Sequence, residues 1–356
     1  MSRSASVGRR LRLLSGGLAV VALAAGAASV SGPASAAVPD QYGFVLWNGG
    51  AVDPTGTTPP GTSVSVGGVG VYKVGFVGAA AKGGVVHVTA INPSPHWCQV
   101  NSFGPVGSDE VATISCYKVG GAPDYTNFSA VFGSSTGPTG PGAFGYVNAL
   151  PSGSLVSQYN SAGAGNVVSH PSTGVWNVQF PGLSTPGPID GSLQATAVSP
   201  ASVPARCKVF TWSSSPSGQF AQVNCYNPGG APFDTQFDLT YQYQRALWGG
   251  YGPPKYFGYL WNQPVGGPAS TNYNNPLGPG ANSLSPGTMA TVKFPSLAVL
   301  PDDLQVTAAG QGSDFCGLDK PWQHLGSDTV AQYVNCFTNS GTPIGSGFLI
   351  SDNSQN

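Results

Sequence analysis

Six cysteines set a fixed period along this chain of 356 residues. They fall into three pairs: Cys98 with Cys116, Cys207 with Cys225, and Cys316 with Cys336. The first cysteines of successive pairs are 109 residues apart both times. A repeat of this length predicts three copies of one structural unit. Six cysteines allow fifteen pairings, but a pair that recurs at a constant interval favours one disulfide inside each copy.

Similar sequence segments surround the cysteines of each pair and set the limits of the copies. Val223-Asn224-Cys225-Tyr226 corresponds to Val334-Asn335-Cys336-Phe337, and Gly229-Gly230-Ala231-Pro232 corresponds to Gly120-Gly121-Ala122-Pro123. Each copy opens alike, with Tyr42-Gly43-Phe44, Phe144-Gly145-Tyr146 or Phe257-Gly258-Tyr259. We therefore predict β-repeats over residues 40–133, 143–246 and 256–350, called copies 1, 2 and 3 below.

The amino terminus predicts export from the cell. Arg9, Arg10 and Arg12 precede an apolar run over residues 13–30, and Ala34-Ser35-Ala36 has the small-residue pattern of a cleavage site. These are the marks of a signal peptide over residues 1–36, cleaved near Ala36. Glycines interrupt the run, which disfavours the alternative of a retained membrane anchor. We expect a secreted mature chain without a membrane span, in an oxidising setting where disulfides persist.

The charge of the mature chain narrows the class of partner. Seven lysines and two arginines, Arg206 and Arg245, remain beside fourteen acidic residues, a formal charge of −5. A nucleic-acid surface needs clustered basic residues, and here they are scattered singly. Nucleic acid is therefore an unexpected partner. The surface should be neutral and polar, which suits a neutral polysaccharide or another cell-surface component.

Composition and periodicity predict an all-β fold. With 52 glycines and 32 prolines, helical patterns are interrupted every few residues. Short runs alternate instead, as at Val86, Val88 and Ala90. We expect three tandem antiparallel β-sandwich-like repeats of six or seven strands each. The paired cysteines should lie on neighbouring strands joined by a loop of about 17 residues, and each closure should contribute on the order of 3 kcal/mol.

Two segments are typical of linkers between the copies. Residues 133–142 are almost entirely Ser, Gly, Thr and Pro, which predicts an extended connection. Residues 247–255 contain Trp248 and Tyr251 among Gly and Pro, and such large aromatic side chains indicate that this segment packs against a neighbouring copy.

The inventory of reactive side chains does not favour an enzyme. Glu110 is the only glutamate, and Asp302 and Asp303 should point to opposite faces of a strand. The Gly-x-Ser-x-Gly run at residues 133–137 lies in a stretch of Ser, Gly, Thr and Pro with no helix predicted after it, so it does not have the setting of a nucleophile elbow. The histidines stand at non-equivalent positions in the copies and form no spaced cluster, so we expect neither a metal site nor a cofactor; they are His87, His96, His170 and His324.

Aromatic residues are the better candidates for ligand contacts, because rings stack on the apolar faces of sugars. One recurring position carries Phe103, Trp212 or Trp322, shortly after the first cysteine, and another carries Trp47 or Trp261 in the opening strand. A recurring Trp beside a disulfide also suits core packing. The candidate contacts are Trp47, Trp212, Trp261, Trp322, Tyr241 and Tyr243.

The shared pattern resembles a known type of repeat. The pattern begins with the Phe-Gly-Tyr opening and continues with Cys-x-Val, Trp, Val-Asn-Cys-[Tyr/Phe], Gly-x-Pro-x-Asp and Phe. It is similar to a repeat of secreted, mostly uncharacterised proteins of high-GC Gram-positive bacteria. The resemblance covers nearly all of the mature chain and implies an extracellular β-repeat protein, with no activity attached. Copy 2 matches best, since copy 1 lacks the Trp and copy 3 lacks the Asp.

These observations favour a secreted, non-catalytic β-repeat protein with a role in adhesion, neutral-glycan binding or envelope structure. Three weak sites on one chain would add through effective concentration. One alternative is an extracellular hydrolase with a site between copies, using Glu110 or an Asp. Another is a secreted protease inhibitor that presents the disulfide-bounded segment 99–115, or its equivalents, as a loop.

Overall fold

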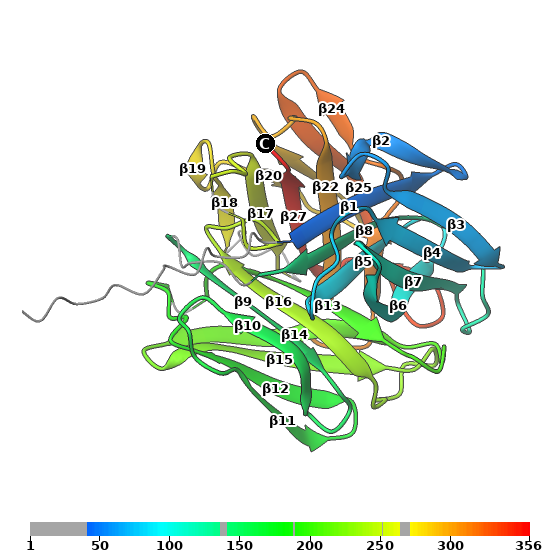
Figure 1. Cartoon of the computed structure of the whole chain (residues 1–356), viewed down its shortest axis with the longest axis horizontal. Helices are drawn as coiled ribbons and strands as arrows, with labels where there is room; N and C mark the ends of the chain where they lie inside the picture. The colour runs from blue at the N-terminus through cyan, green and yellow to red at the C-terminus, as the bar shows by residue number, and fades with distance from the viewer. Residues whose placement is uncertain (1–40, 136–140, 188, 251, 264–270) are drawn as a thin grey trace, which may run out of the picture. The chain divides into compact units, whose positions relative to one another are not determined.

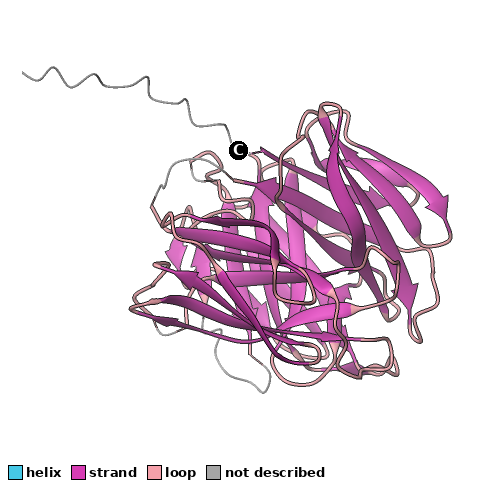
Figure 2. Cartoon of the chain, turned by 60° about the horizontal axis from the view of Figure 1, so that its bottom comes forward, coloured by secondary structure: helices cyan, strands magenta, loops and turns pink. Residues whose placement is uncertain are grey.

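Short runs of alternating apolar and polar residues form strands throughout the described chain. The computed structural model describes residues 41–135, 141–187, 189–250, 252–263 and 271–356, and these residues contain strands and loops but no helix (Figure 2). The chain from Ala37 to Asn356 is one compact unit. The all-β prediction is confirmed.

Each copy contributes more strands than the six or seven predicted, because several runs are interrupted by Gly or Pro and form two short strands. Copy 1 contains β1 (Gln41–Asn48), β2 (Ala51–Thr58), β3 (Ser63–Gly68), β4 (Val71–Phe76), β5 (Val85–Ile91), β6 (His96–Val106), β7 (Asp109–Lys118) and β8 (Asn127–Ser134). Copy 2 contains β9 (Ala143–Ala149), β10 (Leu155–Asn160), β11 (Val167–Ser172), β12 (Val175–Pro181), β13 (Ser192–Val198), β14 (Arg206–Ser215), β15 (Gly218–Tyr226) and β16 (Gln236–Tyr243). Copy 3 contains β17 (Phe257–Asn262), β18 (Asn272–Asn274), β19 (Gly278–Pro279), β20 (Ser283–Ser285), β21 (Met289–Phe294), β22 (Asp302–Ala309), β23 (Phe315–Leu318), β24 (Gln323–Leu325), β25 (Asp328–Phe337), β26 (Pro343–Ile344) and β27 (Gly347–Ser354).

Each copy is a sandwich of two half-sheets around its own core. The opening half-sheet contains the Gly-centred opening strand, as in β2-β1-β8-β5 of copy 1, and the disulfide half-sheet contains the bridged hairpin, as in β6-β7-β4-β3. Alternation decides which side chains face inward. In β12, Trp176 and Val178 are buried in the core while Asn177 is exposed. Copies 1 and 3 have equivalent cores.

The predicted disulfides are confirmed, one in each copy. Cys98 pairs with Cys116, Cys207 with Cys225, and Cys316 with Cys336. In each case the two cysteines face each other directly across adjacent strands, with Cα atoms 4.0 Å apart.

The predicted loop of about 17 residues between the cysteines is wrong in copies 1 and 2. Strands β6 and β7 pair from His96 with Lys118 up to Val106 with Asp109, so only two residues form the turn of the hairpin. Strands β14 and β15 pair in the same way. In both hairpins the strand pairing continues through the segment, with one register shift shortly after the first cysteine. Residues 99–115 are therefore a sheet hairpin rather than a free loop.

The half-sheets are shared between copies, and this arrangement joins the three copies into a closed ring. The disulfide half-sheet of copy 1 continues into the opening half-sheet of copy 2, that of copy 2 into copy 3, and that of copy 3 into copy 1 (Figure 1). Each junction is a short parallel contact at an equivalent position: Val100 with Val198, Val209 with Ala309, and Leu318 with Ile91. The equivalence of the junctions defines an approximate threefold axis.

Strands β5, β13 and β22 lie against one another around this axis, and they bury polar side chains there. His87 Nδ1 lies 3.1 Å from Thr196 Oγ1, and its Nε2 lies 2.8 Å from Thr240 Oγ1. Thr89 donates a 2.8 Å hydrogen bond to Gln305 Oε1. Each of these bonds joins two different copies. Buried polar side chains of these central strands therefore form contacts between copies.

The second linker packs against copy 1, as predicted. Trp248 is buried and stacks on Tyr42 and Phe44, with ring centroids 4.8 and 5.5 Å apart. Tyr251, and residues 136–140 of the first linker, lie outside the described residues.

The predicted signal peptide over residues 1–36 also lies outside the described residues. Within the described ranges, no helix is long and apolar enough to cross a membrane. The three disulfides are consistent with an extracellular protein.

Candidate functional site

Most of the aromatic residues selected from the sequence are in the cores. Trp212 and Trp261 meet between copies 2 and 3, with ring centroids 4.3 Å apart, and Trp322 donates a 2.9 Å hydrogen bond to Asp302 Oδ1. Trp261 and Tyr243 are half-buried. The buried candidates pack rather than present their faces at the surface; they are Trp47, Trp212, Trp322 and Tyr241.

A groove of about 380 Å³ lies instead on the outward face of the disulfide half-sheet of copy 2. The strand order there is β11-β12-β15-β14, and the outward-facing residues stand in two rows across the four strands. The first row is Ser169, Asn177, Gln222 and Thr211, and the second is Val167, Gln179, Phe220 and Ser213. These two rows are called the copy 2 groove below.

Strand register explains why these residue types share one face. Asn177 lies opposite Gln222, and Gln179 lies opposite Phe220, because β12 and β15 pair without interruption. On β14 the register shifts between Val209 and Thr211. This bulge lets both Val209 and Trp212 face the core, and it leaves Thr211 exposed in the groove.

The copy 2 groove is uncharged. None of the residues that line it has an ionisable side chain; they supply amides, hydroxyls and the half-buried ring of Phe220. Amide and hydroxyl groups offer both donors and acceptors to a neutral polar ligand. Phe220 adds an apolar surface in the middle of its row, between Gln179 and Ser213.

The equivalent faces of the other two copies carry charge. In copy 1, Lys73 pairs with Thr113 across β4 and β7 and occupies the position of Asn177, while Val111 occupies the position of Phe220. In copy 3, Lys293 takes the position of Gln179 and forms an ion pair of 2.6 Å with Asp328. Copy 2 alone thus combines an aromatic ring with a neutral polar surface at this position.

Phe220, Asn177 and Gln222 are absent from the sequence-based candidates, which are all Trp or Tyr. A signal for them exists within β15. Ala221, Val223 and Cys225 are core residues of one face, so Phe220 and Gln222 belong to the other.

A second and larger cleft, of about 630 Å³, lies between copies 1 and 2 and contains the single glutamate of the chain. Glu110 is buried, with Oε2 accepting a 3.3 Å hydrogen bond from the backbone N–H of Ala81. Oε1 has no hydrogen-bond partner. Burial raises the pKa of Glu110 to about 7, although the bond from Ala81 opposes this shift.

Glu110 has no second carboxylate beside it among the described residues that line this cleft. Asp302 and Asp303 point to opposite faces, as predicted: Asp302 accepts from Trp322 in copy 3, and Asp303 accepts a 2.5 Å bond from Ser129 in copy 1. A pair of facing carboxylates is what glycoside hydrolysis usually requires.

The histidines lie apart from one another. His87 is buried on the threefold axis, while His96, His170 and His324 each contact one aspartate: Asp124, Asp234 and Asp302. In the described part of the chain no three His, Cys, Asp or Glu side chains are grouped to hold a metal ion.

Comparisons of this chain with family models, with curated proteins and with solved structures find no match. The resemblance to a bacterial repeat therefore stays a prediction.

Proposed function

We propose that this is a secreted, non-catalytic β-repeat protein that binds a neutral polysaccharide through the copy 2 groove. The observation that carries the proposal is the uncharged face built from two cross-strand rows, with Phe220 among amides and hydroxyls. Sugars combine apolar faces with many hydroxyl groups, so they need this mixture of ring and polar partners. A charged ligand would find no counter-charge in the groove.

The test is binding of the mature chain to a panel of insoluble and soluble neutral polysaccharides, with acidic polysaccharides as comparison. Phe220→Ala removes the ring and should weaken binding by about 3- to 10-fold, the range expected for one stacking contact. Val111→Ala, at the equivalent position of copy 1, is the matched control and should bind like the unmodified chain. The proposal is wrong if Phe220→Ala binds as well as Val111→Ala, or if the unmodified chain does not bind.

One observation favours a second function, hydrolysis in the cleft between copies 1 and 2. Glu110 lines that cleft with one buried carboxylate oxygen that has no hydrogen-bond partner, and burial raises its pKa to about 7, as a general acid requires. Release of reducing ends from the same polysaccharide panel tests it. Activity that Glu110→Gln abolishes would establish the hydrolase, whereas binding without release, unchanged in Glu110→Gln, leaves the binding function.

A further inference from the structure

The residue directly before the first cysteine of each copy lies near the threefold axis, and the three residues meet there. They are Trp97, Arg206 and Phe315. The rings of Trp97 and Phe315 have centroids 5.4 Å apart. The guanidinium carbon of Arg206 lies 4.7 Å from the centre of the Trp97 ring and 4.5 Å from that of Phe315. Two aromatic faces thus hold one buried cation.

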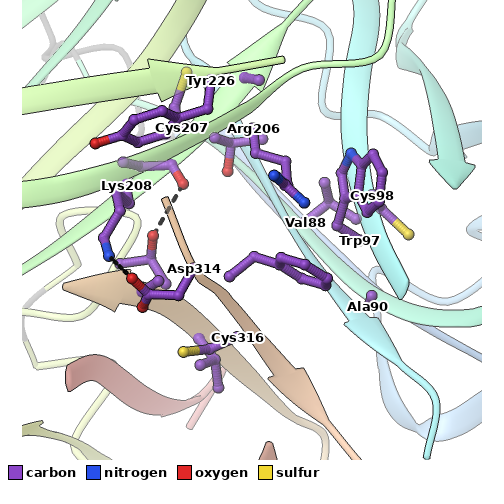
Figure 3. Close-up of a pocket in the computed structure, with 17 residues that line it drawn as sticks. Val88, Ala90, Trp97, Cys98, Arg206, Cys207, Lys208, Tyr226, Asp314 and Cys316 are labelled. Atoms are coloured by element: carbon purple, nitrogen blue, oxygen red, sulfur yellow. Dashed lines mark hydrogen bonds and ion pairs between the residues drawn. The ribbon is translucent and has the colours of Figure 1, made fainter. Parts of the chain in front are cut away.

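A cavity of about 50 Å³ adjoins this group, and residues of all three copies line it. In Figure 3, Arg206 extends toward Trp97 on one side of this axial cavity, and Lys208 pairs with Asp314 on the other. A volume of this size holds a few water-sized groups, so it excludes a sugar ring.

The charges that line the axial cavity do not balance. Arg206 and Lys208 are 6% and 2% exposed, and Asp314 is the single acidic residue among the lining residues. Asp314 is already engaged, because Oδ1 lies 2.7 Å from Lys208 Nζ and Oδ2 accepts a hydrogen bond from Ser346. One positive charge therefore remains without a carboxylate partner.

That charge belongs to Arg206, and its hydrogen-bonding groups are only partly used. Nη2 donates to Asn339 Oδ1 at 2.5 Å and to the carbonyl oxygens of Asn227 and Pro228. Nε and Nη1 are buried and have no partner. Burial lowers the pKa of Arg206 to about 10, so the guanidinium is still charged at neutral pH. A buried, charged and unpartnered N–H is costly unless an acceptor fills the space beside it.

We infer that the axial cavity binds a small monovalent anion, of the size of chloride, on Arg206 Nε and Nη1. The anion supplies the missing negative charge and accepts hydrogen bonds from the two N–H groups of Arg206 that have no partner. Since all three copies line the cavity, the bound anion stabilises the closed ring rather than one copy. The site is independent of the polysaccharide proposal, because it lies on the axis and shares no residue with the copy 2 groove.

Thermal unfolding of the mature chain tests the inference in sodium chloride and sodium gluconate at equal ionic strength. Chloride should raise the Tm by about 2 to 4 °C relative to gluconate, and the rise should saturate as a single site fills. Arg206→Met keeps the volume and removes the charge, so its Tm should not depend on which anion is present. Lys73→Met, which removes an exposed cation, is the control and should keep the full chloride effect.

Bromide-soaked crystals of the unmodified chain give a readout that does not depend on a variant folding. The expected result is an anomalous peak within hydrogen-bonding distance of Arg206 Nε or Nη1. Bromide confined to surface positions, an adventitious ion only, would overturn the inference. A folded Arg206→Met that keeps the chloride-dependent Tm would overturn it as well.

Discussion

Buried carboxyl groups are the most unusual single-residue feature of this fold. Five acidic side chains of the described chain are completely buried: Glu110, Asp238, Asp302, Asp303 and Asp352. Burial raises the pKa of each. Water solvates a carboxylate far better than a protein interior does, so the folded state favours the protonated acid. These groups therefore stabilise the fold most at acidic pH.

The raised pKa of Asp303 should make the stability of the protein depend on pH. Its pKa rises from the ordinary 3.8 to about 7, mainly by burial, although hydrogen bonds from Ser129 and Gln305 oppose the shift. A raised folded-state pKa means that the stabilisation is complete below pH 4 and is lost as the pH rises through 7. His87 acts in the opposite direction: burial lowers its pKa to about 3, so its contribution is lost as the pH falls below 6.5.

We expect the free energy of unfolding to fall between pH 5 and pH 8, and Asp303→Asn to reduce this fall by on the order of 3 kcal/mol. Urea unfolding at a series of pH values measures it. Asp124→Asn is the control, because a hydrogen bond from His96 and the charge of Lys118 lower the pKa of Asp124. The stabilisation from a lowered pKa is lost as the pH falls below the ordinary value of 3.8, so that variant should leave the slope between pH 5 and pH 8 unchanged. A pH profile for Asp303→Asn that matches the unmodified chain would contradict the prediction.

Among the elements, the segment between copies 2 and 3 does more than connect them. Ala246, Leu247 and Trp248 are buried with Phe44 and Val131 of copy 1 in a small core of their own. The backbone N–H of Leu247 also donates a 2.9 Å hydrogen bond to Asn353 Oδ1, in the last strand of copy 3. One short segment thus ties copy 1 and copy 3 to the end of copy 2.

Trp248→Ala should therefore destabilise the protein by about 3 to 5 kcal/mol, the cost of a large cavity in a packed core. The midpoint of urea unfolding reports the change. Leu277→Ala is a suitable control, because Leu277 is 52% exposed and its removal should cost little. A loss below about 1 kcal/mol for Trp248→Ala would show that the segment rests loosely on copy 1.

At the scale of the whole molecule, the shared half-sheets make the copies interdependent. A copy cut from the chain would expose the edges of β5, β6 or their equivalents, which pair with other copies in the intact ring. It would also expose the polar axis, where His87, Thr89 and Gln305 take their partners from neighbouring copies. No copy is complete without the other two.

The mature chain should therefore unfold in a single cooperative transition, with equal calorimetric and van't Hoff enthalpies. Replacing only Cys207 and Cys225 by alanine should lower the Tm of that whole transition, since the bridge contributes on the order of 3 kcal/mol. Differential scanning calorimetry measures both. Two or three separate transitions, with only one of them shifted in the variant, would show that the copies fold independently.

The sequence determined most of what depends on neighbouring residues and on repetition, although the hairpins between the paired cysteines of copies 1 and 2 were expected to be loops. The 109-residue period identified the copies, the cysteine spacing identified the disulfides, and alternation along strands such as β5 and β12 identified the fold class. The alternation of inward-facing and outward-facing residues along β15 also indicates that Phe220 lies on the outward face. These features are local, so the chain itself displays them.

Only the tertiary structure decided how the copies share their sheets and what meets on the axis. The junction between Leu318 and Ile91 is a single parallel residue pair that joins the last copy to the first, and no local pattern marks it. The same long-range packing brings Arg206 between Trp97 and Phe315 and places Trp212 against Trp261 of copy 3. Contacts of this kind arise because three incomplete sandwiches cover one another's edges, which is a property of the assembled ring and not of any one segment.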